Sequence, residues 1–85
     1  MYKQATYNLA IGLTVRQLHE ERKLRRETIA DALEISEMAV SDIEHGAEML
    51  TAGALILLLE TLGVSWEEFI TRVRSNLPEA QSQIV

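Results

Sequence analysis

Cysteine is absent from this chain of 85 residues. Without a thiol the protein forms neither a disulfide framework nor a thiolate metal site. The only two histidines, His19 and His45, have a spacing that matches no ligand motif, so we expect no metal and no cofactor. The sequence also lacks a Gly-rich phosphate loop and a nucleophile with a neighbouring base. We therefore expect a protein that is not an enzyme.

Long apolar runs are also absent. The longest one, residues 54–59, is far shorter than the roughly 20 residues that a membrane-spanning helix needs. The N-terminus lacks a charged segment followed by an apolar one, which is the pattern of a secretory signal. We expect a cytoplasmic protein that does not act on membranes.

Basic residues are few and unevenly placed. The formal net charge of −5 opposes nonspecific binding to DNA or to anionic membranes. Four of the eight Lys and Arg residues lie within residues 22–26, whereas residues 32–70 contain none. This basic cluster is either a solvated helix end, where cations favour the helix dipole, or an anchor for phosphates.

Apolar residues recur with helical spacing, and no strand pattern is evident. Ile11, Val15 and Leu18 form one apolar stripe, which predicts a first helix that ends near Lys23. Four more helices are predicted over residues 27–33, between Ser36 and Gly46, over residues 51–62, and from Ser65 to Pro78.

Local signals support these helix limits. Ser36 is a good N-cap, and Gly46 suits a left-handed C-terminal cap. Ser65 and Glu68 form a capping box, and Pro78 is expected to end the last helix. The fold class is therefore all-α, with one five-helix domain over residues 1–77 and a short C-terminal tail over residues 78–85.

The segment "ETIADALEISEMAVSDIEHG" contains two of these predicted helices. Two short helices joined by a turn of three or four residues cross at a large angle, which lets the second one protrude. Val40 and Ile43 would hold the protruding helix against the core. The residues left facing outward are Glu37, Met38, Ser41, Asp42 and His45.

Residues 11–70 resemble the lambda-repressor/Cro-like (XRE-type) helix-turn-helix DNA-binding family. The resemblance rests on "IGLTVRQLHEERKL", "IADAL", "ISEMAVSDIEHG" and "LLLETLGVSWEEFI". It implies a compact five-helix lambda-repressor-like domain of bacterial or phage origin that binds double-stranded operator DNA, usually as a homodimer. The second and third helices would form the reading unit, and the protein would lie on the nucleoid when bound.

The resemblance also implies roles for single residues. Arg26 stands at the start of the second helix, where the family usually has a glutamine that contacts a phosphate, and Arg25 lies beside it. Glu37 is the first residue of the recognition helix. The DNA-binding residues implied are Arg25, Arg26, Glu37, Met38, Ser41 and Asp42.

Other positions depart from the family pattern. Glu44 and Gly46 match its "ExG" ending, in which the glutamate commonly pairs with an arginine of the first helix. His19 stands where that arginine is expected, so we expect His19 and Glu44 to form a structural pair. Glu34 replaces the turn glycine, which costs about 1 kcal/mol if its backbone is left-handed.

The acidic recognition helix leaves two functions open. Glu37 either only favours the helix dipole or accepts a hydrogen bond from cytosine N4. Met38 packs either on a thymine methyl group or on a protein partner. The leading hypothesis is a sequence-specific DNA-binding transcriptional regulator, a dimeric repressor. The alternative is a protein-interaction module derived from this fold, or an antitoxin-like partner-binding protein, with weak or no DNA binding.

The predicted fourth helix carries apolar residues on every side, in "GALILLLE". Such a helix is normally buried on more than one side. We expect a dimer surface on the fourth and fifth helices that includes Leu57 and Ile70, and the alternative is a crowded core around Leu57.

Overall fold

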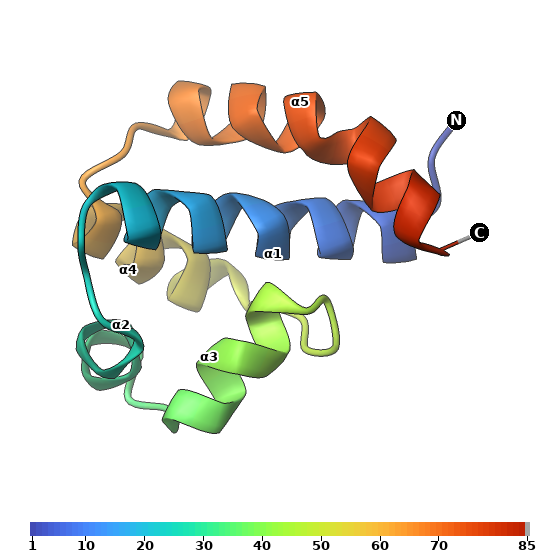
Figure 1. The fold of residues 1–85 in the computed structure, drawn as a ribbon. Coiled ribbons are helices and arrows are strands. Elements are labelled where there is room, and N and C mark those ends of the chain that lie inside the picture. The colour runs from blue at the N-terminus through green and yellow to red at the C-terminus, as the bar shows by residue number, and fades with distance from the viewer. Residues whose placement is uncertain (85) are drawn as a thin grey trace.

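The structure is a computed structural model that describes residues 1–84, which fold into five helices without a strand (Figure 1). The helices are α1 (Gln4–Glu21), α2 (Arg26–Leu33), α3 (Glu37–Glu44), α4 (Ala52–Leu62) and α5 (Trp66–Ile84). The all-α fold class predicted from the sequence is confirmed. Within the described residues, no helix is long and apolar enough to cross a membrane.

Helix α1 is the centre of the fold. α5 runs along one side of it, and α2 and α3 lie on the other side, with α4 behind (Figure 1). Leu18 of α1 is fully buried, as are Ile29 of α2, Leu58 of α4 and Phe69 of α5. Val40 of α3 is fully buried as well, and all these side chains belong to one hydrophobic core, so each of the five helices contributes a fully buried side chain to it.

Side chains cap the starts of three helices, and the caps at Ser36 and Ser65 are those that the sequence predicted. The backbone N–H of Ala39 donates to the Ser36 hydroxyl at 3.0 Å, and that of Glu68 donates to the Ser65 hydroxyl at 3.1 Å. Thr51 caps α4 in the same way. Each cap satisfies one of the backbone donors that a helix start leaves free, so the sequence defines these helix starts locally.

The prediction that Pro78 ends the last helix is wrong. α5 continues to Ile84, although a proline inside a helix removes one backbone hydrogen bond and costs about 3 kcal/mol. Packing against α1 offsets this cost: Leu77 and Ala80 are buried, and the Thr6 hydroxyl donates to Gln81 at 2.9 Å. The helix changes direction toward its C-terminal end (Figure 1), as a proline kink would cause.

The predicted tail therefore continues α5 up to Ile84, and Val85 lies outside the described residues. The boundary of the folding domain at residue 77 stays a prediction.

A close approach between α1 and the end of α3 depends on Gly12. A Cβ atom at Gly12 would lie 2.5 Å from the carbonyl oxygens of both Ile43 and Glu44. No side chain fits there, so only glycine lets α3 pack this closely on α1. Gly46, which has a φ of +74°, lies against Leu9 of α1 and turns the chain away from α3. These two glycines set the position of α3 relative to the core.

Leu57 is not part of a crowded core. It is 45% exposed on the outer side of α4, and the neighbouring Ile56 is 58% exposed. The alternative that Leu57 is buried within the domain is therefore wrong. Ile70 is partly buried and packs against the core.

Candidate nucleic-acid interface

The turn between α2 and α3 places the two helices at a large angle. α2 is seen along its axis in Figure 1, whereas α3 lies across the view. Glu34 caps α2 with a left-handed backbone (φ 57°, ψ 44°), so the strain expected at this position is confirmed. The Ile35 N–H donates to the Ala30 carbonyl oxygen at 3.0 Å, which closes the end of α2 before the chain enters α3.

Helix α3 exposes two of the four side chains within it that the sequence placed outward, and the other two are partly buried. Val40 and Ile43 are buried against the core, whereas Met38 is 72% exposed and Glu37 is exposed at the first position of the helix. Ser41 and Asp42 are partly buried. Within residues 1–84, neither Glu37 nor Asp42 forms an ion pair. The exposed side of α3 therefore carries uncompensated negative charge.

The predicted basic cluster does not act as one unit. Arg22 lies 3.7 Å from Glu68 on α5 and contacts Glu21, so it joins α1 to α5. Arg25, the N-cap residue of α2, is exposed and has no ion-pair partner in the described part of the chain. Arg26 points to a different acceptor, the carboxylate of Glu44.

Glu44 joins three helices. Its side chain is only 1% exposed, and its Oε1 accepts a hydrogen bond from Arg26 Nε at 3.1 Å. Its Oε2 lies 3.0 Å from His19 Nε2, so the structure brings together the two residues that we expected to pair. Neither His19 Nε2 nor Glu44 Oε2 has a hydrogen-bond partner among the described residues, so this second contact is close but is not a hydrogen bond. Arg26 is thus the one hydrogen-bond donor that the described structure gives to the Glu44 carboxylate.

The His19 ring is fixed from its other side. Its Nδ1 lies 3.1 Å from the Leu24 carbonyl oxygen, which only accepts hydrogen bonds, so Nδ1 carries a hydrogen and donates it. The sequence predicted the His19–Glu44 contact but missed the Arg26–Glu44 bond. Residues 26 and 44 lie on different helices, and only the crossing of α2 and α3 brings them together.

A second charged contact holds α1 to α5. Arg72 donates hydrogen bonds to both carboxylate oxygens of Glu21, at 2.5 and 2.7 Å. These bonds lower the pKa of Glu21 below its ordinary value of 4.5 and raise that of Arg72. This pair belongs to the scaffold, because it lies on the α1–α5 side of the molecule, away from α3.

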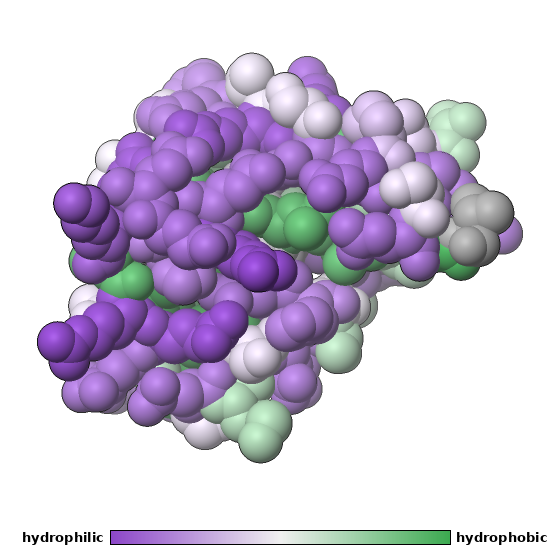
Figure 2. All heavy atoms as spheres, viewed as in Figure 1, coloured by the Kyte–Doolittle hydropathy of each residue, from purple (hydrophilic) through white to green (hydrophobic). Residues whose placement is uncertain are grey.

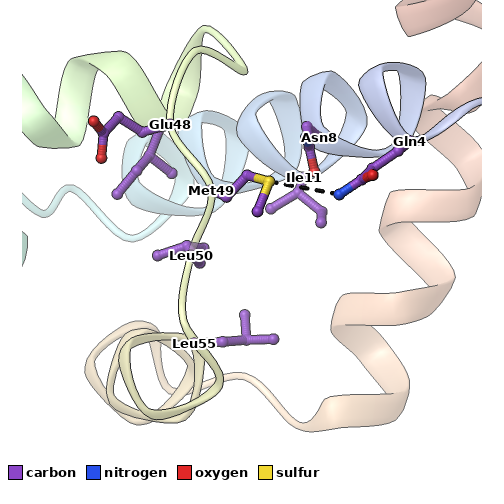
Figure 3. Close-up of a pocket in the computed structure, with 8 residues that line it drawn as sticks. Gln4, Asn8, Ile11, Glu48, Met49, Leu50 and Leu55 are labelled. Atoms are coloured by element: carbon purple, nitrogen blue, oxygen red, sulfur yellow. Dashed lines mark hydrogen bonds between the residues drawn. The ribbon is translucent and has the colours of Figure 1, made fainter.

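A small pocket of about 160 Å³ lies beside the segment that joins α3 to α4 (Figure 3). Gln4, Asn8 and Ile11 of α1 line one part of it, and Leu55 of α4 lines another. The Gln4 amide donates to the Met49 sulfur at 3.5 Å, which ties the connecting segment to α1. The pocket contains no set of residues suited to catalysis, so we assign it to the packing of this connection.

The surface around the candidate interface is largely hydrophilic in the view of Figure 2, where only small hydrophobic areas appear. In the part of the chain that the structure describes, no three His, Asp or Glu side chains are grouped to hold a metal ion. The arrangement is suited to binding through one protruding helix.

The family model for the "Helix-turn-helix domain" matches residues 10–69, which is most of the chain. The chain belongs to the helix-turn-helix family. This match confirms the resemblance seen in the sequence, and it includes α2, α3 and the turn between them.

Helix-turn-helix relatives agree with this assignment. The HTH-type transcriptional regulator RamB of Mycobacterium tuberculosis (strain H37Rv) is 39% identical over 54 residues, which cover 64% of this chain and 11% of RamB. The chain thus spans about a tenth of the length of that regulator.

Two solved structures share the fold. The clp gene regulator ClgR from Corynebacterium glutamicum superposes with a TM-score of 0.82 at 18% identity, over 91% of this chain and 82% of the other. The restriction-modification controller protein C.Esp1396I, as a tetramer in complex with its natural 35 base-pair operator, superposes with a TM-score of 0.72. It is 18% identical, over 89% of this chain and 97% of the other.

Proposed function

We propose that this chain is a sequence-specific DNA-binding transcriptional regulator that reads operator DNA with α3. The observation that carries the proposal is the protruding α3, which exposes Glu37 and Met38 and whose acids Glu37 and Asp42 form no ion pair within residues 1–84. The RamB and C.Esp1396I relatives support it, because one is named a transcriptional regulator and the other was solved on its operator. The place of action that follows is the bacterial nucleoid, in the cytoplasm.

Backbone contacts in this proposal come from the start of α2. Arg25 is free to approach a phosphate as a point charge. Arg26 uses Nε for Glu44, and its two terminal amino groups remain available for a phosphate. Phosphate contacts fix the register of the protein on the duplex without carrying sequence information.

Base contacts come from the first half of α3. Met38 is exposed enough to pack on a thymine methyl group, and the Ser41 hydroxyl can bond either a base or the backbone. Glu37 accepts a hydrogen bond from cytosine N4 when a cytosine lies opposite. Glu37 and Asp42 repel phosphates elsewhere, so the acids weaken nonspecific complexes and thereby increase specificity.

A selection from a pool of randomised DNA duplexes tests this proposal. We expect one sequence to be enriched, and we expect wild-type protein to bind it far more tightly than a scrambled duplex at low salt. Glu37→Gln should tighten binding to the scrambled duplex and lower the ratio of the affinities for the enriched and the scrambled duplex. Asp42→Lys should tighten binding to both duplexes and steepen the dependence of the affinity on salt.

The second candidate is a protein-interaction module, which the uncompensated acidic surface of α3 favours. In that case α3 docks on a basic protein partner, and the chain acts as an antitoxin-like protein. Selection would then enrich no sequence, and Glu37→Gln would not rescue DNA binding. That pair of results would replace the DNA-reading proposal by this one.

We also propose that the regulator is a homodimer through the outer side of α4. Leu57 and Ile56 are the large apolar residues that α4 exposes, and burying one such side chain contributes about 2 kcal/mol. Ile70, the other residue predicted for this surface, contributes less because it already packs on the core.

Sedimentation tests the dimer. Wild-type protein should sediment as a dimer at micromolar concentration, an order of magnitude typical of a modest interface. Leu57→Lys should yield monomers and weaken operator binding, because a monomer presents only one α3. Tyr7→Lys, at an exposed aromatic residue of α1, is the control that should remain dimeric. Monomeric wild-type protein at high concentration would contradict this interface.

A further inference from the structure

Glu44 is buried, and a buried carboxylate needs hydrogen-bond donors to remain charged. Its neighbours supply one donor in hydrogen-bonding geometry, Arg26 Nε at 3.1 Å, while the contact with His19 is not a hydrogen bond. The guanidinium of Arg26 is thus held from inside the protein, although the Arg26 side chain is 43% exposed.

An arginine can serve two acceptors at once. The guanidinium is planar and has five N–H donors in a fixed fork, so Nε can donate to one group while the terminal amino groups face another. In this structure Nε is bound to Glu44, and the exposed part of the side chain lies at the first residue of α2, beside the exposed Arg25. A lysine has one ammonium group at the end of a flexible chain, which cannot bridge two separated acceptors with the same rigidity.

We infer that Glu44 is a positioning residue for DNA binding, which orients the Arg26 guanidinium toward a DNA phosphate and ties that contact to the position of α3. This inference rests on the proposed function, in which Arg26 contacts the backbone. Glu44 touches no DNA itself. It is the last residue of α3, so an Arg26 that is bound to both Glu44 and a phosphate fixes the recognition helix against the duplex.

A matched pair of charge-conserving substitutions tests the inference. Arg25 and Arg26 are adjacent, but only Arg26 is bound to Glu44. In Arg26→Lys the ammonium group should bind the buried Glu44 carboxylate and leave the phosphate. The slope of log K against log salt should then become shallower by about 0.9 per protomer, although the net charge is unchanged. Arg25→Lys should leave the slope unchanged, because Arg25 has no ion-pair partner in the described part of the chain and a lysine supplies the same positive charge to the phosphate.

The probes are the duplex enriched by selection and its scrambled counterpart. Arg26→Lys should weaken binding to both duplexes about tenfold, the factor that corresponds to one charge-assisted hydrogen bond. The inference would be overturned if Arg26→Lys left the slope of log K against log salt unchanged, or if Arg26→Lys and Arg25→Lys lost equal DNA affinity. Either result would leave the proposed DNA binding intact. Wild-type protein that binds neither duplex would instead overturn the proposed function.

A measurement without DNA tests the positioning itself. The Arg26 Nε–H should give a distinct NMR signal that exchanges slowly with water, since Nε is bound to a buried acceptor. Glu44→Gln, which keeps the size of the side chain, should speed that exchange and lower DNA affinity. Arg25→Ala should weaken DNA binding by the same factor in the Glu44→Gln background as in the wild-type protein. Rapid exchange in the wild-type protein would show that Glu44 does not hold Arg26.

Discussion

Gly12 gives the sharpest test of how α3 is positioned. Replacing it by alanine adds a Cβ atom that would lie 2.5 Å from two carbonyl oxygens at the end of α3, whereas ordinary contact begins at 3.4 Å. Both neighbours are backbone atoms, which cannot rotate away as a side chain would. α1 and α3 must therefore separate by about 1 Å, an overpacking that costs up to about 3 kcal/mol.

Gly53 provides the control for the effect of alanine on helix formation. A Cβ atom at Gly53, in the first turn of α4, meets nothing within 4 Å. Gly53→Ala should therefore stabilise the protein, by about 0.5 kcal/mol or somewhat more, because alanine is the better helix former. Gly12 lies in the interior of α1, where the gain in helix propensity is larger, about 1 kcal/mol, and offsets part of the clash, which leaves a net loss of about 2 kcal/mol.

Thermal and urea unfolding, followed by circular dichroism, measure both variants. For a domain of this size, the loss at Gly12 corresponds to a fall of about 10 °C in Tm. Operator binding should weaken as well, because α3 is displaced. Gly12→Ala with wild-type stability, or a gain like that of Gly53→Ala, would refute the close approach of α1 and α3.

Two further predictions concern the scaffold. Glu34→Gly should stabilise the protein by about 1 kcal/mol in urea unfolding, because glycine adopts the left-handed backbone without strain. Gly63, which caps α4 with a φ of +66°, is the converse case, and Gly63→Ala should destabilise the protein similarly. A Glu34→Gly variant with wild-type stability would count against the strain. Arg72→Met should lower the free energy of unfolding at neutral pH. Since the pKa of Glu21 is lowered in the folded state, the advantage of wild type is present above the unfolded value near 4.5 and disappears as pH falls through the folded value. Arg74→Met is the control, and a wild-type advantage that persists in acid would rule out Glu21 as its source.

Local signals in the sequence were sufficient for most helix limits. Ser36 and Ser65 cap helices through hydrogen bonds to backbone groups three residues away, so neighbouring residues alone specify them. The outward position of Met38 also followed from the sequence, because Val40 and Ile43 define the buried side of α3. The strain at Glu34 was expected from the resemblance to the family, which has a glycine at this turn position.

Pro78 and Leu57 show where local rules were insufficient. Proline disfavours a helix interior, but packing on α1 over the last turns of α5 outweighs that preference. Leu57 is apolar, but whether an apolar residue faces the core or solvent depends on which side of α4 the rest of the domain covers. Both outcomes depend on contacts between segments far apart in the chain.

The candidate interface shows the same division between sequence and tertiary structure. The sequence by itself determined that the chain contains a helix-turn-helix unit, and its resemblance to the family placed Arg26 at the start of the second helix. Only the tertiary structure decided that Arg26 is bound to the buried Glu44 and that Gly12 admits the end of α3 against α1. The physical reason is that a hydrogen bond between two helices, and the space between two backbones, depend on the angle and distance at which those helices pack.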